Sequence, residues 1–379
     1  EILIGLVGSE MCIRDSLKEE RIMEKIHINL GSDSYDVHIE SGLIDKAGSA
    51  IADLTGAEKA AVITEDTIDK LYGMRLVSSL EKAGIKAKMI VVPGTEKSRS
   101  LPIVNSIYGA LADFGLGNDD ILIALGGRIV GDVTGFAAAT WHRGVRYIQF
   151  PTSVLSQIGS AIGGKVTLDI TAGKNLVGMF YQPAAVYIDP SMAKSLPRRY
   201  LHNGLGEAVK LGCVADKDLF ELFEKAGSDM DILRVLPEII QRCVAIKAHY
   251  VEIDPGAKGE RRILDFGHTI GGAIERCYRY DDAKITHGEA TAIGMNLMTR
   301  RSELLGLTEQ GTSERLEYVL KSLSLPTTVN IPDEILTAQM YKDKRITEGK
   351  IQLTLLKRIG EGFLHTVPVE ELPRYVKTK

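Results

Sequence analysis

The sequence lacks the features of secreted, membrane-spanning and zinc-ribbon proteins. Its four cysteines, Cys12, Cys213, Cys243 and Cys277, include no Cys-x-x-Cys pair, so they form neither a disulfide framework nor a zinc ribbon. We therefore expect unpaired thiols in a reducing cytosol, which makes the protein cytoplasmic. No apolar run approaches the roughly 20 residues that a membrane-spanning helix requires, and no membrane partner is expected.

A strong net charge is also missing. The 46 Lys and Arg against 50 Asp and Glu leave a formal charge of -4, which provides no long-range attraction for nucleic acid. A local cationic pocket is still compatible with this balance. The chain of 379 residues is longer than a typical domain with one hydrophobic core. Its apolar content of 44% is enough to form two cores, so two globular domains are expected.

The apolar pattern changes near residue 190. Residues 1–22 differ in character from the rest of the chain, and we interpret them as an extension or sequence artefact with Met23 as the natural start. Helical patterns at residues 68–83 and 100–114 separate short apolar runs, so residues 23–190 are predicted to form a parallel α/β domain. The predicted strands are an antiparallel pair at 25–30 and 35–39, and buried strands at 60–64, 86–92, 121–125, 147–150 and 185–188.

Residues 191–379 are predicted to form an almost wholly helical second domain. Alternation at residues 351–356 favours one late strand within it. The amphipathic segments that predict its helices are residues 219–226, 238–253, 268–278, 289–305 and 313–323.

A glycine-rich turn at residues 126–136 follows the apolar run at 121–125. A buried strand that leads into glycines and then a helix is typical of a phosphate-binding turn. The spacing Gly126-Gly127-x-x-x-Gly131-Asp132 is not the dinucleotide fingerprint, however, and close strand-to-helix packing without a ligand explains the glycines about as well. Both interpretations stay open from the spacing alone.

One carboxylate and two imidazoles form a candidate metal-ligand set. Glu207 and Lys210 would share a helix face, where an ordinary ion pair is the simpler interpretation. His268 and His287 are each flanked by glycine where a helix is expected to begin, which leaves their rings little steric cover. The three donors suit a divalent ion such as zinc, with positions open for water or substrate oxygens.

Cations and an amide could hold an anionic ligand. Lys165, Lys174 and Asn175 lie in glycine-rich segments, where backbone amides and point charges can bind phosphate, although loop punctuation is about equally compatible. The local pattern does not distinguish three more cations from solvated surface charge: Arg143, Lys247 and Arg261.

Together these segments resemble the 3-dehydroquinate synthase family, and the likeness runs from about residue 23 to residue 372. It implies an N-terminal nucleotide-binding α/β domain, a C-terminal all-α domain, a divalent metal and NAD. The motifs that carry it occur in one order, at residues 62–66, 93–99, 126–136, 151–153, 163–165, 173–175 with 180–183, 206–210, 261–269, 287–290 and 343–345.

The resemblance also implies site residues and a reaction. Glu207, His268 and His287 would hold the metal, zinc or cobalt, and Arg143 would reach the phosphate bound by the other subunit of a homodimer. The residues that would contact the substrate are Lys165, Asn175, Lys210, Lys247 and Arg261. The NAD site would be lined by Glu96, Arg99, Gly127, Arg128, Gly131, Asp132, Thr152, Ser153, Lys165, Lys174 and Lys194.

The family converts 3-deoxy-arabino-heptulosonate 7-phosphate, a small phosphorylated sugar acid, into 3-dehydroquinate and phosphate. The step belongs to the shikimate pathway of chorismate and aromatic amino acid biosynthesis. Its course is oxidation of a carbinol by NAD, elimination of phosphate, return of the hydride, ring opening and aldol closure. Because the hydride is returned, NAD is expected to act catalytically.

Four positions depart from the pattern that the resemblance implies. Arg128 replaces a third glycine of the family's turn, and Gly159 replaces an aspartate near the nicotinamide. Asp265 replaces an asparagine, and Gly272 replaces a histidine that aids proton transfer. A cyclase acting on another phosphorylated ketose, such as sedoheptulose 7-phosphate, would change such residues, and a catalytically impaired NAD-binding homologue would lose them. A metal-dependent alcohol or glycerol dehydrogenase is the remaining alternative.

Overall fold

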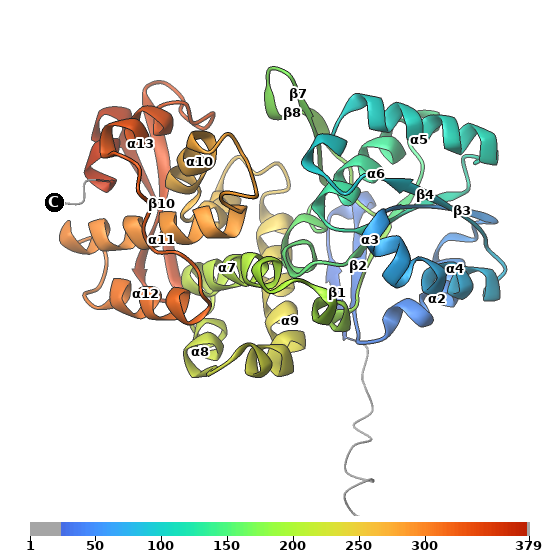
Figure 1. The fold of residues 1–379 in the computed structure, drawn as a ribbon, viewed down its shortest axis with the longest axis horizontal. Coiled ribbons are helices and arrows are strands. Elements are labelled where there is room, and N and C mark those ends of the chain that lie inside the picture. Colours follow the sequence, from blue (N-terminus) through green and yellow to red (C-terminus); the bar gives the residue numbers. More distant parts are fainter. Residues whose placement is uncertain (1–23, 377–379) are drawn as a thin grey trace, which may run out of the picture.

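The computed structural model describes residues 24–376, and the extension assigned to residues 1–22, with Met23, lies outside them. Two lobes lie side by side, an α/β lobe and a mainly helical lobe (Figure 1). The predicted division between residues 190 and 191 falls inside the 3-10 helix η7 (Pro190–Ser195) and stays a prediction. No helix within residues 24–376 is long and apolar enough to cross a membrane.

The α/β lobe is built on a seven-stranded sheet with the order β1-β2-β9-β6-β5-β3-β4. As predicted, β1 and β2 are antiparallel and the other neighbours are parallel. The strands are β1 (Glu24–Ile28), β2 (Tyr35–Ile39), β3 (Lys59–Glu65), β4 (Lys86–Val92), β5 (Ile121–Gly126), β6 (Tyr147–Pro151) and β9 (Ala185–Ile188).

Helices cover this sheet because its central strands are apolar on both faces. Every residue of β5 is buried, as are all residues of β6 and β9. The helices of this lobe are α2 (Ala47–Thr55), α3 (Asp66–Ile68), α4 (Met74–Lys82), α5 (Leu101–Phe114) and α6 (Arg128–Thr140). A separate hairpin of β7 (Lys165–Ile170) and β8 (Gly173–Phe180) projects between the lobes (Figure 1).

The second lobe is mainly helical, as predicted, and contains one antiparallel hairpin. Its strand β10 (Lys350–Arg358) includes the predicted residues 351–356, and its partner β11 (Glu361–Pro368) was not predicted. The helices are α7 (Arg198–Ala215), α8 (Lys217–Lys225), α9 (Asp229–Ile253), α10 (His268–Cys277), α11 (His287–Leu304), α12 (Thr312–Ser322) and α13 (Asp333–Met340).

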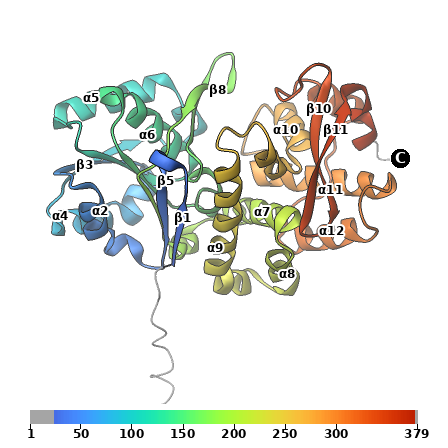
Figure 2. The same ribbon diagram turned by 180° about the vertical axis from the view of Figure 1, so that it is seen from behind.

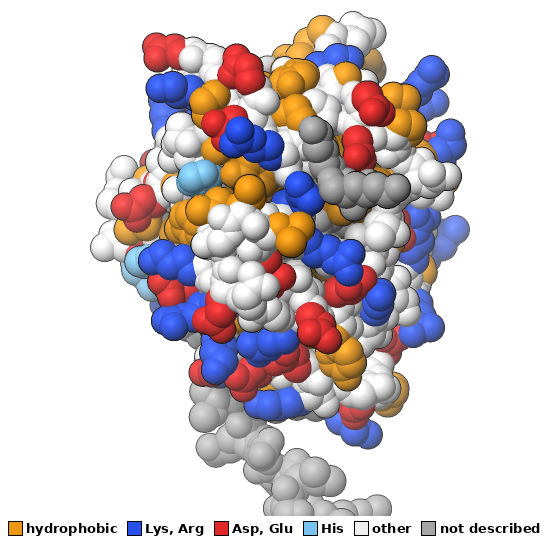
Figure 3. Space-filling view, turned by 90° about the vertical axis from the view of Figure 1, so that its left-hand side faces the viewer, with side chains coloured by type: hydrophobic (Ala, Val, Ile, Leu, Met, Phe, Trp, Pro, Cys, Tyr) orange, Lys and Arg blue, Asp and Glu red, His pale blue; other side chains and the backbone are white. Residues whose placement is uncertain are grey.

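The two lobes share a hydrophobic core along α9. Ile28 of β1 and Val37 of β2 are fully buried in the same cluster as Ile240 and Val244 of α9. Figure 2 shows α9 running beside β1 at the back of the molecule. At the far end of the helical lobe, basic and acidic side chains are interspersed over the visible face (Figure 3). The shared core fixes where the helical lobe meets the sheet, and therefore where residues of both lobes can meet.

Candidate metal and cofactor site

The carboxyl ends of the parallel strands carry the predicted NAD residues. Glu96 begins the 3-10 helix η4 (Glu96–Ser98) after β4, Gly127 precedes α6 after β5, and Thr152 and Ser153 follow β6. The carboxyl ends of neighbouring parallel strands lie at one edge of the sheet, which is where ligands of open α/β sheets bind. The fold thus brings these segments together.

Two glycines after β5 are in close contact with neighbouring side chains, and a third has free space beside it. A Cβ on Gly131 would lie 2.9 Å from Gln149 Oε1, and one on Gly135 would lie 2.3 Å from Val166 Cγ1. These two glycines allow α6 to pack closely on the sheet and on β7. At Gly127 the nearest atom would be Ser153 Oγ at 3.7 Å, so this backbone position at the start of α6 is accessible. Close packing therefore accounts for Gly131, and a ligand-facing amide is compatible with Gly127.

Arg128 forms an ion pair with a predicted NAD residue. Its Nη2 lies 2.6 Å from Glu96 Oε1, while Lys174 Nζ of the β7–β8 hairpin lies 3.2 Å from Glu96 Oε2. Lys174 also lies 4.8 Å from the ring centroid of Tyr280, which belongs to the helical lobe. The extra charge introduced by Arg128 is thus balanced within the lobe by a neighbouring carboxylate.

Arg99 connects the glycine-rich turn at residues 126–136 to the β7–β8 hairpin. Its side chain is completely buried, and Nε lies 2.9 Å from Asp132 Oδ2. Its Nη2 donates to Thr167 Oγ1 at 2.6 Å and also to Asn175 Oδ1. Arg99 is enclosed by these groups, so its role in NAD binding, like that of Asp132, stays a prediction and its observed contacts are structural.

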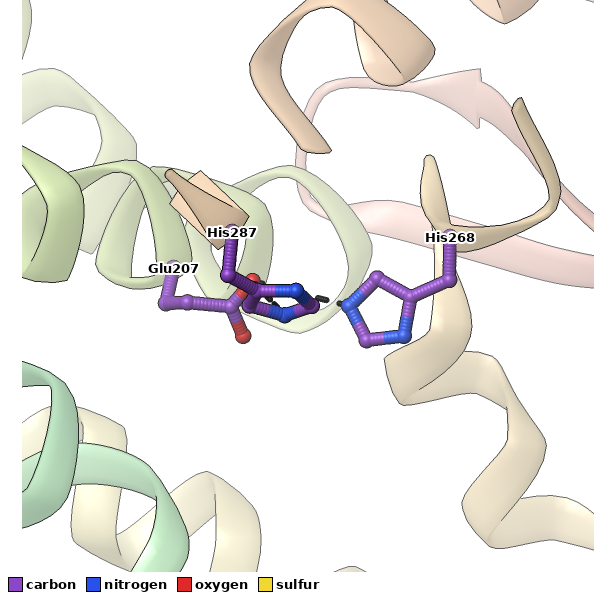
Figure 4. A group of neighbouring side chains, drawn as sticks. All are labelled: Glu207, His268 and His287. Atoms are coloured by element: carbon purple, nitrogen blue, oxygen red, sulfur yellow. Dashed lines mark ion pairs between the residues drawn. The ribbon is translucent and has the colours of Figure 1, made fainter. Parts of the chain in front are cut away.

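Glu207, His268 and His287 converge on one point. One ligand atom from each lies within 4.8 Å of the other two. The Nε2 atoms of His268 and His287 are 3.5 Å and 3.6 Å from Glu207 Oε1. Figure 4 shows both imidazoles pointing at the carboxylate from separate segments of the chain. Because each histidine is the first residue of its helix, α10 or α11, the predicted helix starts are confirmed.

The donor set fits a divalent cation. Glu207 Oε1 is buried and has no hydrogen-bond partner within the described part of the chain. Burial raises the pKa of Glu207, but the Lys210 ammonium and the two imidazoles outweigh burial and hold that pKa well below its ordinary value. An ionised carboxylate beside two imidazole nitrogens is a typical zinc ligand set.

Carboxylates behind both histidines orient the rings. His268 Nδ1 lies 3.5 Å from Asp265 Oδ1, and His287 Nδ1 lies 3.2 Å from Glu275 Oε1. A proton on each Nδ1 would leave each Nε2 with a lone pair for a metal ion, which is the tautomer that a metal ligand requires. In this structure His268 Nε2 also lies 3.0 Å from Lys210 Nζ. The sequence interpretation did not include Glu275, since no local pattern marks it as a partner of His287.

Four predicted substrate-binding cations gather beside this centre. Lys210 Nζ is 2.5 Å from Glu207 Oε2, and Lys247 Nζ donates to the carbonyl of Gly159. Burial, followed by the charges of Arg261, Lys165 and Lys210, lowers the pKa of Lys247 well below its ordinary value. Like charges crowded together in this way are costly in the absence of an anion, so the cluster suits a phosphate or carboxylate ligand.

A small cavity of about 50 Å³ connects the metal-ligand set to the cation cluster. The residues that line it are Ile158, Gly159, Glu207, Lys210, Leu211, Lys247 and Leu264.

Gly163 makes room for Arg261. The guanidinium lies so close that a Cβ on Gly163 would be 2.3 Å from Arg261 Nη2, and the positive φ of +88° also favours glycine. Lys344 was missed by the sequence interpretation, although its charge adds to desolvation and to the charge of Arg261 in lowering the pKa of Lys165.

Two predicted site residues lie apart from this cluster. Arg143 is exposed in the loop between α6 and β6, with a left-handed φ of 71°, at the amino end of β6 rather than its carboxyl end. Lys194 is exposed on η7. The structure of one chain does not bring Arg143 to its own cation cluster.

The structure shows what surrounds two of the departures from the family pattern, Asp265 and Gly272. The charge of Asp265 is compensated, because Arg345 Nη1 lies 3.0 Å from Asp265 Oδ2. Gly272 lies inside α10, one turn after His268, and a Cβ there would meet only Arg276 Nη1 at 3.6 Å. A side chain larger than hydrogen therefore fits at residue 272.

We expect Gly272→Ala to stabilise the protein by about 0.5–1 kcal/mol, because glycine in a helix interior loses more backbone entropy on folding than alanine. The neighbouring Gly271→Ala is the matched control and should destabilise, since its Cβ would lie 3.0 Å from the carbonyl oxygen of Ala290. Urea unfolding of both variants measures the two signs. Equal shifts in one direction would contradict this interpretation of α10.

The acid stability of the protein should depend on Glu96. Burial raises the pKa of Glu96, but Arg128, Lys174 and Arg99 outweigh burial and lower it to about 2 from the ordinary 4.5. The stabilisation is therefore present above pH 4.5 and is lost as the pH falls toward 2. A shift of this size corresponds to about 3 kcal/mol. Glu96→Gln should lower the free energy of unfolding at pH 7 and flatten its decrease below pH 4.5.

The measurement is urea unfolding between pH 7 and pH 3, with the exposed Glu314→Gln as control. Parallel pH curves for the wild type and Glu96→Gln would show that the surrounding cations do not stabilise this carboxylate.

Sequence families match most of the chain. Residues 89–203 match the 3-dehydroquinate synthase N-terminal family, and residues 204–346 match the 3-dehydroquinate synthase C-terminal family. The 3-dehydroquinate synthase of Clostridium acetobutylicum is 42% identical over 356 residues, which cover 94% of this chain and 99% of that protein. The 3-dehydroquinate synthase of Clostridium perfringens strain SM101 is 44% identical, over 92% of this chain and 99% of that protein.

Solved structures agree on the fold. The 2-epi-5-epi-valiolone synthase of Streptomyces hygroscopicus subsp. jinggangensis, with NAD+ and Zn2+ bound, superposes with a TM-score of 0.80 at 25% identity, over 90% of this chain and 95% of that chain. A 2-deoxy-scyllo-inosose synthase in complex with carbaglucose-6-phosphate, NAD+ and Co2+ has a TM-score of 0.83 at 22% identity, over 93% of this chain and 100% of that chain. On the family matches and these sequence identities, the chain belongs to the 3-dehydroquinate synthase family.

Proposed function

We propose that the chain converts 3-deoxy-arabino-heptulosonate 7-phosphate into 3-dehydroquinate and phosphate. The observation that carries this proposal is the convergence of Glu207, His268 and His287 beside Lys210 and Lys247. Such a site offers metal ligands and phosphate-binding cations to one small molecule. Its position in a chain 42–44% identical to 3-dehydroquinate synthases favours this substrate over other phosphorylated ketoses.

The proposed cofactors are NAD and one divalent metal ion, zinc or cobalt. When bound, NAD would supply reversible hydride transfer and the ion would polarise a substrate oxygen. Glu207, His268 and His287 would hold the ion. The proposed NAD residues are Glu96, Arg99, Gly127, Arg128, Gly131, Asp132, Thr152, Ser153, Lys165, Lys174 and Lys194.

The chain's own side chains bind the substrate and balance its charge. Lys165, Lys247 and Arg261 are already crowded together, and a phosphate among them would relieve their repulsion while they orient it for departure. Lys210 lies between this group and Glu207, where its ammonium can donate to a substrate oxygen. Asn175, at the start of β8, is proposed to add an amide contact.

We also propose that the protein is a homodimer. In each subunit, residues 23–190 would bind NAD and residues 191–379 would bind the metal and the substrate. Arg143 lies at the amino edge of the sheet, away from its own cation cluster, so its proposed role is to contact the phosphate bound by the partner subunit.

With glycine at position 272, proton transfer relies on the substrate phosphate as its own base, and general acid-base help of this kind is worth typically 10²–10⁴-fold.

The test is phosphate release from 3-deoxy-arabino-heptulosonate 7-phosphate with NAD and Zn2+ or Co2+ supplied, while dehydroquinate is monitored. We expect stoichiometric phosphate and dehydroquinate without net NADH. Release only from sedoheptulose 7-phosphate would assign the chain to another cyclase activity. Tight NAD binding with no release from either substrate would indicate an impaired homologue, and net NADH from a simple alcohol would indicate a dehydrogenase.

A further inference from the structure

Arg345, near the metal-ligand set, donates a hydrogen bond from every nitrogen of its guanidinium. It lies between α13 and β10, and only 19% of its side chain is exposed. Nε and Nη2 form a bidentate pair with the two oxygens of Asp343, at 2.9 Å and 2.5 Å. Its remaining donors reach Asp265 Oδ2 and Thr269 Oγ1, both at 3.0 Å.

These last two contacts lie on both sides of His268 in the chain. Asp265 precedes it by three residues and Thr269 follows it directly, so one planar guanidinium holds the segment that enters α10. Asp265 uses its two oxygens differently: Oδ2 accepts from Arg345, and Oδ1 lies 3.5 Å from His268 Nδ1. Arg345 therefore fixes the carboxylate that faces the back of the imidazole.

The backbone of the same segment is held by close packing on α11. Gly267 has a φ of +79°, and a Cβ there would lie 2.6 Å from Met295 Cγ and 2.7 Å from the carbonyl oxygen of Thr291. A Cβ on Gly294 would lie 2.1 Å from the carbonyl oxygen of Gly267. Since α11 also begins with His287, the backbones of the two histidines have a fixed separation. What remains to be set at His268 is the orientation of the ring and the position of its proton.

We propose that Arg345 is a positioning residue that acts through Asp265 to hold His268 with Nε2 directed at Glu207. This inference rests on the metal site of the proposed function. Lysine cannot replace Arg345, because one ammonium lacks the planar array of donors that reaches Asp343, Asp265 and Thr269 together. Asparagine, which the family pattern implies at residue 265, keeps one acceptor oxygen for the two donors, Arg345 and His268, whereas alanine keeps none.

Cobalt binding to the full-length chain tests this role without turnover. We would measure the Co2+ dissociation constant and the visible d–d absorption of the wild type, Arg345→Lys, Asp265→Ala and the double variant. Each single variant should weaken Co2+ binding about 10–100-fold and change the d–d bands, as is typical when a partner of a metal-binding histidine is lost. The double variant should be less impaired than the product of the two single effects, because both act on one contact.

Arg315→Lys is the matched control. Arg315 also forms a bidentate pair, with Glu224 at 2.9 Å and 2.7 Å, but the pair joins α12 to α8 outside the metal-ligand set. Thermal unfolding identifies any variant that fails to fold, and Arg345→Lys, which keeps the positive charge, then carries the test. Cobalt affinity and d–d bands equal to those of Arg315→Lys would overturn the positioning role. A wild type that binds no Co2+ would overturn the proposed metal site together with it.

Discussion

Replacement of Glu207 by alanine is expected to abolish metal binding and to reduce phosphate release by at least about 10²-fold. Glu207 supplies the only carboxylate in the three-residue set, and both His268 Nε2 and His287 Nε2 face its Oε1 atom. Without it, two imidazoles and the Lys210 ammonium would surround the position, and that positive charge would repel a divalent ion. The measurements are metal content per chain by mass spectrometry and the rate of phosphate release.

Glu207→Gln separates the loss of charge from the loss of packing. It keeps the volume beside the buried Lys210 and should lose metal as Glu207→Ala does. Glu221→Ala, on the surface of α8, is the matched control and should keep full metal content. Full metal content and full activity in Glu207→Ala would exclude Glu207 as a ligand.

Lys247→Met is expected to change activity and stability in opposite directions. Lys247 is half-buried beside Arg261, Lys165 and Lys210, so removal of its charge relieves repulsion and should stabilise the protein by about 1–2 kcal/mol. The same change removes a cation proposed to bind the substrate, and turnover should fall about 10²–10³-fold. Functional sites often have this conflict between activity and stability.

The pH dependence of stability gives a second readout. Because the pKa of Lys247 is lower in the folded chain than its ordinary 10.5, the unfolded chain binds more protons between these two values. Stability attributable to Lys247 therefore rises with pH across that window, and Lys247→Met should remove the rise. Lys225→Met, at an exposed position of α8, should change neither quantity. A destabilised Lys247→Met would indicate that its bond to the Gly159 carbonyl outweighs the repulsion.

Strands of the main sheet were predictable because burial on both faces produces continuous apolar runs, as at residues 121–125. The hairpin of β7 and β8 was interpreted as glycine-rich turns, although β7 alternates buried Val166 and Leu168 with more exposed residues. Its lysines and glycines obscured that alternation. In α7, polar residues such as His202 and Asn203 are buried, so no amphipathic pattern marked the whole helix.

The site was predictable only where a local pattern exists. Glycines beside His268 and His287 indicated exposed imidazoles at helix starts, and the structure brings both to Glu207. The contact between Arg345 and Asp265 was not predictable, because the two residues are 80 positions apart in the chain and no periodicity relates them. The packing role of Gly131 likewise depends on a strand formed later in the chain.

The buried Arg99 guanidinium has a thermodynamic consequence. It forms an ion pair with Asp132 of the glycine-rich turn and donates hydrogen bonds to Thr167 and Asn175 of the hairpin that carries Lys165. A ligand that shifts one side of this contact changes the free energy of the other side. If NAD and the sugar phosphate bind as proposed, linkage requires that any effect of one on the affinity of the other be reciprocal, by the same factor. Arg99 would thus couple the proposed cofactor site to the proposed substrate site.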